Sequence, residues 1–253
     1  MKTIIQVWTH SCINTEGFWG LGDMIRGTCF LYEYCKKHNY QFILDIQLHG
    51  ISNYLIHSPH EYSDIILKNK DNIFFVNIDS DISKYTQNNI NYFFTNASIY
   101  TYENINEDTK EFIKNIFKPN EKFSKYLSEY LTLPFFQNKY SVLHYRLGDK
   151  YNENVEPYLK NIKNNIEENQ IFISDSNELK YIVKNNTKLF MLDIEPGHIG
   201  INLNVKNDLI EYFILMKCDK IKTYSNYSWI SGFVHSINKI YNIQLINIKY
   251  QIV

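Results

Sequence analysis

Residues 139–149 read Lys-Tyr-Ser-Val-Leu-His-Tyr-Arg-Leu-Gly-Asp, and the rest of the chain is organised around them. The apolar run Tyr140–Tyr145 predicts a short buried strand. The strand leads into a cluster that is too polar for a core, made of His144, Arg146, Gly148 and Asp149. Because ligands of open α/β sheets bind beyond the carboxyl ends of the strands, this stretch predicts the start of a binding site.

Arginine is scarce in this chain, which makes each one informative. Lys and Arg together number 26, and only Arg26 and Arg146 are arginines. Lysine replaces arginine at little cost on a solvated surface, but not where a planar guanidinium must hold two oxygens of one phosphate or carboxylate. Arg146 is therefore the first candidate for binding such a group. The alternative is an arginine that pairs with Asp149 and braces a loop.

The composition indicates a globular protein with one large or two small domains. Of the 253 residues 44% are hydrophobic, and a formal net charge of −1 with no basic block argues against a nucleic-acid partner. The four cysteines show neither zinc-ligand spacing nor a paired pattern, so we expect reduced thiols and a cytoplasmic protein. We expect no signal peptide and no integral membrane segment, because the apolar runs fall short of the ~20 residues of a span.

The first 46 residues predict the opening of a parallel α/β sheet. We expect a strand, a glycine loop, a helix and a second strand, with the regular elements over 3–8, 24–38 and 42–46. The loop ends in Gly20-Leu21-Gly22-Asp23 at the helix start, where free N–H groups and the helix dipole favour an anion or a polar ligand. Gly20 and Gly22 are therefore candidate binding residues. Asp23 also fits an ordinary helix N-cap.

The middle of the chain is less regular. We expect helices over 53–65, 108–116 and 121–131, and strands over 73–78 and 90–94. Asp79-Ser80-Asp81 follows a strand and leaves open a metal site of the kind that metal-dependent sugar transferases use. A domain boundary is predicted between about Leu133 and Lys139, which gives domains of residues 1–135 and 136–253.

The second half alternates strands with helices, a pattern typical of a Rossmann-like parallel sheet. We expect strands over 140–145, 171–174, 189–194, 220–223 and 244–248, and helices over 156–168, 177–185, 208–217 and 228–239. Polar clusters follow three of the strands, at 144–149, 174–176 and 224–229. Each cluster could merely cap a helix. Three of them on one edge of a sheet favour a composite site.

These motifs together resemble a known family. His144-Tyr-Arg146-Leu-Gly148-Asp149 is similar to the H-x-R-x-G-D signature of the GDP-fucose-dependent fucosyltransferases that make α-1,2, α-1,6 and protein O-linked fucose. Residues 172–176 resemble their second motif, 208–229 their third, and 20–23 their amino-terminal G-x-G-N loop. The sequence departs from the family at Leu147, where many members have a second arginine, and at Tyr224, Asn226 and Asp23.

The resemblance implies a GT-B glycosyltransferase fold, with two Rossmann-like domains facing across a cleft. It also implies an inverting, metal-independent transfer of L-fucose from GDP-fucose to a hydroxyl of a glycan or glycoprotein. The first domain would serve the acceptor and the second the nucleotide sugar. The changed motif positions leave open another donor, such as GDP-rhamnose or a UDP- or dTDP-sugar, and also a sugar-nucleotide-binding protein without turnover.

The resemblance further implies roles for individual residues. Arg146 would bind the diphosphate, with neutral donors from Ser225, Ser228 and the helix that opens at residue 228. Asp175 would accept hydrogen bonds from guanine, His144 would line the nucleotide pocket, and Asp149 would brace Arg146. The remaining nucleotide-site candidates are Gly20, Gly22, Ser174 and Asn226. The acceptor-side base would come from the first domain, where Asp23 and Glu16 are both candidates.

Overall fold

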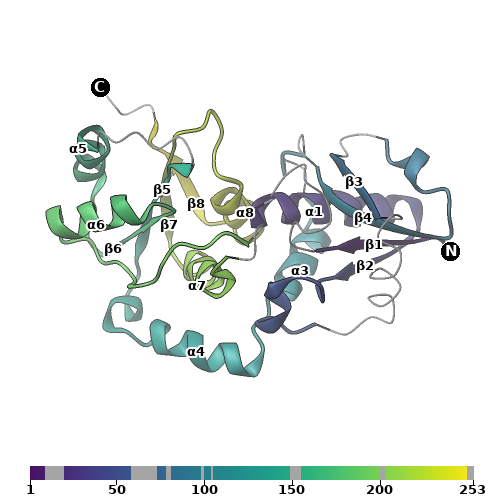
Figure 1. Ribbon diagram of the computed structural model, residues 1–253, viewed down its shortest axis with the longest axis horizontal. Coiled ribbons are helices and arrows are strands. Elements are labelled where there is room, and N and C mark those ends of the chain that lie inside the picture. The colour runs from purple at the N-terminus through teal and green to yellow at the C-terminus, as the bar shows by residue number, and fades with distance from the viewer. Residues whose placement is uncertain are drawn as a thin grey trace. The chain divides into compact units, whose positions relative to one another are not determined.

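The computed structural model describes residues 1–8, 20–57, 73–77, 81–97, 100–103, 105–148, 155–199 and 203–249 (Figure 1). The chain forms two compact units. The N-terminal unit comprises Met1–Phe123 with His198–Val205, and the C-terminal unit comprises Ser124–Gly197 with Lys206–Val253. The sequence places the boundary at residue 135. The units divide earlier, and a short segment from the second half of the chain belongs to the N-terminal unit.

The N-terminal unit is built on a parallel sheet with the strand order β2-β1-β4-β3. Its strands are β1 (Thr3–Val7), β2 (Gln41–Asp45), β3 (Ile73–Asn77) and β4 (Ile90–Asn96). The central strand β1 is buried along its whole length, and the side chain of its polar residue Gln6 is hydrogen-bonded at both ends. Gln6 Oε1 accepts from Thr28 Oγ1 at 2.6 Å and Gln6 Nε2 donates to the Thr95 carbonyl at 3.3 Å. The expected strands are confirmed.

Helix α1 (Leu21–His38) covers this sheet and packs against β2 and β4 (Figure 1). Its buried face carries apolar residues at helical spacing, including Met24, Ile25, Cys29 and Leu31. Gly27 lets the helix approach β4 closely, because a Cβ there would lie 2.1 Å from the Thr95 carbonyl oxygen. Basic residues in the last turn suit the helix C-terminus.

Helices α3 (Glu107–Ile116) and α4 (Glu121–Leu131) follow where the sequence predicts them. The helix expected from residue 53 is wrong over its first residues. A single 3-10 turn, Gly50–Asn53, ends there, and Leu55 instead forms a bridge with Pro119. The turn ends because Ile56 N–H donates to the Lys118 carbonyl rather than to a helical partner. The remainder of that expected helix, from residue 58, lies outside the described residues.

The C-terminal unit contains a second parallel sheet, with the order β6-β5-β7-β8. Its strands are β5 (Ser141–Arg146), β6 (Gln170–Ser174), β7 (Lys220–Ser225) and β8 (Gln244–Asn247). Its helices are α5 (Glu156–Asn165), α6 (Asn177–Asn186), α7 (Val205–Leu215) and α8 (Gly232–Tyr241). The predicted alternation of strand and helix is thus confirmed, and β5 lies at the centre of the sheet.

Two expectations for this unit are wrong. Residues 189–194 form no strand: Phe190 makes one bridge to Ile171, and its ring stacks on Phe135 at 4.3 Å. Lys180 Nζ donates a hydrogen bond to the Ile194 carbonyl, so that carbonyl is not used for pairing with a strand. Helix α8 begins at Gly232 rather than at residue 228. The residues between β7 and α8 therefore form a longer turn than the sequence predicts.

Candidate functional site

Three turns of the C-terminal unit lie at the same edge of its sheet. Strands β6, β5 and β7 are neighbours and run parallel, with Tyr145 opposite Ser174 and Arg146 opposite Ser225. Their carboxyl ends therefore carry the turns that begin at Arg146, Asp175 and Asn226 side by side. This is the edge at which open α/β sheets bind ligands.

An ion pair between Arg146 and Asp175 forms the centre of this edge. Arg146 Nη1 lies 2.5 Å from Asp175 Oδ2. The other carboxylate oxygen accepts the Leu147 N–H at 2.8 Å, and Oδ2 also accepts the Gly148 N–H at 2.8 Å. The Arg146 side chain remains 31% exposed, against 16% for Asp175. A guanidinium has five N–H donors in a fixed planar arrangement. Asp175 can therefore orient the group through one N–H donor while other N–H donors remain able to bind an anion.

The brace is supplied by a residue that the sequence predicts for a different task. Asp175 is predicted to bind guanine, whereas Asp149, the predicted brace, lies outside the described residues. A carboxylate has about four lone-pair sites, and Asp175 already fills three of them. Binding of two guanine N–H groups by this carboxylate would require one of these bonds to open. That role stays a prediction.

Gly148 is required by the shape of the turn after β5. Its φ is +58°, in the left-handed region, and an added Cβ would lie 2.3 Å from Tyr227 Oη. Across the gap between β5 and β7, the Asn226 N–H donates to the Arg146 carbonyl at 3.0 Å. The turns after β5 and β7 are therefore fixed to each other by a backbone hydrogen bond and by the packing of Tyr227 on Gly148.

His144 lies within the sheet rather than at its open edge. The side chain is buried, and Nδ1 is 3.0 Å from Thr223 Oγ1. The pKa of the imidazole is lowered to about 4, chiefly by burial; the Asp175 charge opposes this shift and the Arg146 charge adds to it. His144 is therefore neutral at pH 7.

The predicted hydroxyl and amide contacts have different positions. Ser174 is buried and its Oγ accepts from the Ser176 N–H at 3.2 Å, whereas Ser225 is buried at the end of β7. Asn226 exchanges hydrogen bonds with the Tyr158 hydroxyl at 3.2 and 3.0 Å. Ser228 is exposed and precedes the start of α8, so it does not belong to the first turn of that helix as the sequence predicts.

The two departures at Leu147 and Tyr224 are core positions. Leu147 is fully buried. The Tyr224 ring stacks on Tyr145 at 5.0 Å and meets Tyr158 edge-on at 5.8 Å. These side chains fill the hydrophobic core behind the edge, whereas the Arg146 side chain remains partly exposed.

Sequence reasoning missed one buried acid near this edge. Glu211 lies in α7 among apolar residues and is 8% exposed. Burial raises the pKa of its carboxyl to about 8, Lys180 opposes that rise, and Asp208 and Asp175 add to it. Glu211 is therefore largely protonated at pH 7. The available signal was a single glutamate within the run Leu209-Ile210-Glu211-Tyr212-Phe213.

The glycine loop of the N-terminal unit ends at the start of α1. Gly20 is the N-cap, and no side chain caps the helix there, so the N-cap reading of Asp23 is wrong. Asp23 instead lies in the first turn, where its carboxylate is 3.6 Å from Arg26 and 36% exposed. The Gly22 carbonyl accepts from the Tyr102 hydroxyl at 3.0 Å. Glu16, the other candidate base, lies outside the described residues.

Comparison with solved structures identifies this architecture. No protein-family model matches the sequence, and no curated protein matches it either. NodZ alpha-1,6-fucosyltransferase soaked with GDP-fucose aligns with a TM-score of 0.60 at 11% identity, over 94% of this chain and 92% of that chain. A second structure, of fucosyltransferase NodZ from Bradyrhizobium, aligns with a TM-score of 0.59 at 11% identity, over 94% of this chain and 91% of that chain. An arginine-to-lysine mutant of Arabidopsis thaliana FUT1 in complex with GDP aligns with a TM-score of 0.60 at 10% identity, over 97% of this chain and 70% of that chain.

The chain has the fold of these fucosyltransferases. The expected fold class, α/β with two Rossmann-like units as in GT-B glycosyltransferases, is confirmed. At 10–11% sequence identity, the similarity is one of backbone fold.

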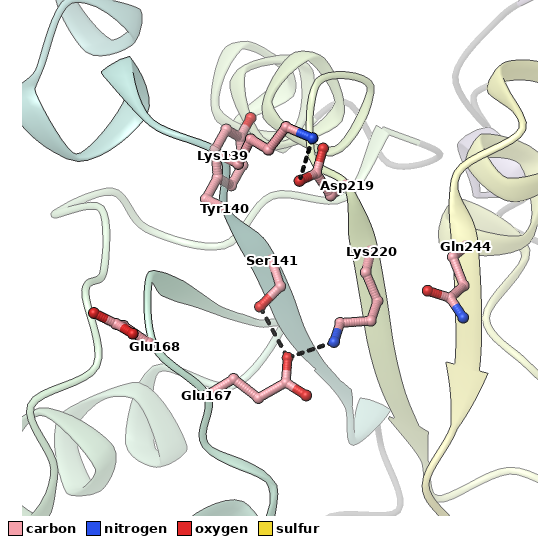
Figure 2. A pocket seen from close by; sticks show the side chains of 8 residues that line it. All are labelled: Lys139, Tyr140, Ser141, Glu167, Glu168, Asp219, Lys220 and Gln244. Carbon is pink, nitrogen blue, oxygen red and sulfur yellow. Dashed lines mark hydrogen bonds and ion pairs between the residues drawn. The ribbon is translucent and has the colours of Figure 1, made fainter.

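A cavity of about 320 Å³ lies at the opposite edge of the C-terminal sheet (Figure 2). Its walls come from the amino ends of β5, β7 and β8 and from the residues before β6. The charges pair with each other: Lys220 lies 2.7 Å from Glu167, and Lys139 lies 4.0 Å from Asp219. This edge is the one away from the strand carboxyl ends, where open α/β sheets bind their ligands.

The described ranges of the chain contain no group of three or more His, Cys, Asp or Glu that could hold a metal ion. Of the predicted Asp-rich turn, Asp79 lies outside those ranges. Asp81 accepts the Ser83 N–H at 2.9 Å, which caps a short turn.

Cys35 and Cys218 are buried and unpaired, and burial raises the pKa of each thiol to about 12. Over the same described part, no helix has the length and apolar character needed to cross a membrane.

Proposed function

We propose that this protein is an inverting, metal-independent glycosyltransferase that transfers L-fucose from GDP-fucose to a hydroxyl of a glycan or glycoprotein. The observation that carries the proposal is the braced Arg146 at the carboxyl edge of a Rossmann-like sheet, in a chain with the fold of fucosyltransferases. The C-terminal unit would bind the nucleotide sugar, and the N-terminal unit would serve the acceptor. No nucleic-acid partner is proposed.

The chemistry requires fixed positive charge where GDP departs. The acceptor oxygen attacks the anomeric carbon as the bond from that carbon to the β-phosphate oxygen breaks, and the bonding pair moves onto the phosphate. Without a metal ion, the growing negative charge must meet preorganised donors. Arg146 supplies a guanidinium that Asp175 holds in one orientation. Ser225 and the N–H groups of the turn after β7 are candidates for neutral donors.

The acceptor hydroxyl must also lose a proton. Asp23 is the candidate base among the described residues, because its carboxylate is partly exposed at the glycine loop and lies 3.6 Å from Arg26. Glu16 remains the alternative. The proposal places the enzyme in the cytoplasm, a reducing compartment that suits the buried unpaired thiols of Cys29, Cys35 and Cys218.

The experiment that tests this function is a calorimetric titration of the purified protein with GDP, GDP-fucose, UDP and dTDP, each with and without Mg²⁺. We expect the GDP compounds to bind without Mg²⁺ and UDP and dTDP to bind at least ten-fold more weakly. Arg146→Lys should weaken GDP binding strongly, because an ammonium cannot replace the two-pronged guanidinium contact. Tighter binding of UDP or dTDP, or a requirement for Mg²⁺, would rule out the GDP-fucose assignment.

Titration with further sugar nucleotides and an assay of GDP release separate the rivals. A transferase for another deoxysugar would prefer GDP-rhamnose, a UDP-sugar or a dTDP-sugar over GDP-fucose. A sugar-nucleotide-binding protein without turnover would bind GDP-fucose but release no GDP from it when offered glycan acceptors.

A further inference from the structure

The turn between β7 and α8 presents an aromatic pair beside Arg146. Trp229 is 60% exposed, and its ring stacks on Tyr227 with centroids 4.9 Å apart and planes 26° from parallel. Trp is rarely so exposed, since its indole is large and mostly apolar. A single exposed aromatic residue on a mobile side chain would need no explanation. This one is supported from behind by a second ring.

The supporting ring is itself fixed at several points. The Tyr227 N–H donates to Ser225 Oγ at 3.2 Å, and the Tyr227 carbonyl accepts from Lys249 Nζ. The Tyr227 ring also packs on Gly148, where a Cβ would lie within 3 Å of three of its atoms. The stacked pair is therefore attached both to the end of β7 and to the turn that follows Arg146.

The turn that carries the pair is hydrogen-bonded to the backbone of Arg146, the residue that would hold the diphosphate. The Asn226 N–H donates to the Arg146 carbonyl, and Trp229 follows three residues later. Three Cα–Cα steps span at most about 11 Å. The hexose of a nucleotide sugar is bonded directly to the β-phosphate, so it lies within a few ångströms of the group that Arg146 would bind. On the other side of Arg146, Asp175 presents a carboxylate already engaged in hydrogen bonds.

We propose that the indole of Trp229, backed by Tyr227, is the platform on which the hexose ring of the nucleotide-sugar donor stacks. This inference rests on the proposed function and adds a residue that selects the sugar rather than the nucleotide. The face of an aromatic ring is negative and attracts the weakly positive C–H groups of a pyranose. A 6-deoxyhexose adds an apolar methyl group. The same face favours the positive charge that develops on the ring during transfer.

The test measures the dissociation constants of GDP and GDP-fucose for the parent protein, Trp229→Ala and Trp229→Phe. We expect Trp229→Ala to weaken GDP-fucose binding by about 5- to 10-fold, in line with roughly 1 kcal/mol for an aromatic contact, and to leave GDP binding within 2-fold. Trp229→Phe should weaken GDP-fucose binding less than Trp229→Ala does. Tyr181→Ala is the matched control, because Tyr181 is 69% exposed on α6 of the same unit. It should change neither constant.

Two results for Trp229→Ala would overturn this inference without affecting the proposed function. Equal weakening of GDP and GDP-fucose binding would mean that the indole contacts the nucleotide or maintains the shape of the turn. No change in either dissociation constant would mean that the indole does not contact the donor. Failure of the parent protein to bind GDP and GDP-fucose overturns the proposed function, and the inference falls with it. Thermal unfolding of each variant checks that a loss of binding is not a loss of fold.

Discussion

Arg146 and Asp175 are joined at the ends of two neighbouring strands, with Nη1 and Oδ2 2.5 Å apart. Arg146 ends β5 and Asp175 follows β6. The same carboxylate also accepts two backbone N–H groups of the turn after β5. The Asp175 side chain thus fixes both the guanidinium of Arg146 and the backbone that presents it.

We expect Asp175→Asn to weaken GDP binding by about ten-fold or more and to lower the free energy of unfolding by about 1–3 kcal/mol, because hydrogen bonds to a charged acceptor are lost. Calorimetry and urea denaturation measure the two effects. The control is Asp219→Asn, which removes an exposed pair with Lys139 at 4.0 Å and should cost under about 1 kcal/mol. Equal effects of the two substitutions would show that Asp175 is an ordinary surface partner.

Gly148 should tolerate no side chain. Alanine at φ +58° is strained, and its Cβ would overlap the Tyr227 hydroxyl. We expect Gly148→Ala to cost about 1–3 kcal/mol of stability. Gly20→Ala is the comparison, since a Cβ there meets its nearest atom at 3.8 Å, and it should cost about 1 kcal/mol or less. Adding Tyr227→Phe to Gly148→Ala should restore part of the loss. Full stability of Gly148→Ala by thermal denaturation would contradict this account.

Glu211 predicts a pH dependence of stability. Its pKa is raised to about 8 by burial, whereas an unfolded chain has about 4.3. Between these pH values the folded protein keeps a proton that the unfolded chain releases, so this group's contribution to stability falls as pH rises from about 4 to about 8.

Glu211→Gln removes this dependence while keeping a side chain of similar shape. We expect the variant to gain a few degrees in Tm over the parent at pH 8 and to show a smaller gain at pH 5. Thermal denaturation from pH 5 to pH 9 measures the difference, with the exposed Glu168→Gln as control. A difference between Glu211→Gln and the parent that stays constant with pH would argue against a buried protonated carboxyl.

Asp23 is tested as the acceptor-side base. Asp23→Asn keeps the size of the side chain and removes its basicity, so kcat should fall by about 10²- to 10⁴-fold while the Kd for GDP stays nearly the same. Glu16→Gln is measured in parallel to separate the two candidates. Stability should change little, because the pair with Arg26 is 3.6 Å long and Asp23 is 36% exposed. An Asp23→Asn variant with unchanged kcat would exclude Asp23 as the base.

The sequence alone determined most of the elements and their order. Strand and helix lengths follow from local periodicity and from turn residues, which is why β5, α6 and β7 begin and end within two residues of their predicted bounds. The edge that carries the polar turns also follows from sequence, because parallel strands connected by helices place all their carboxyl ends together. The motif around Arg146 predicted the fold that the solved structures share.

Only the tertiary structure decided which side chains meet. The partner of Arg146 is Asp175, which is far from it in sequence and adjacent in the sheet, whereas sequence proximity had favoured Asp149. Burial decides the charge state of Glu211 and His144, and a pattern of residue types carries no information about desolvation. The later start of α8 leaves Trp229 on an exposed turn, because Tyr227 packs on Gly148 instead of continuing into a helix. These are contacts between segments far apart in the chain, and they form only when the sheet brings those segments together.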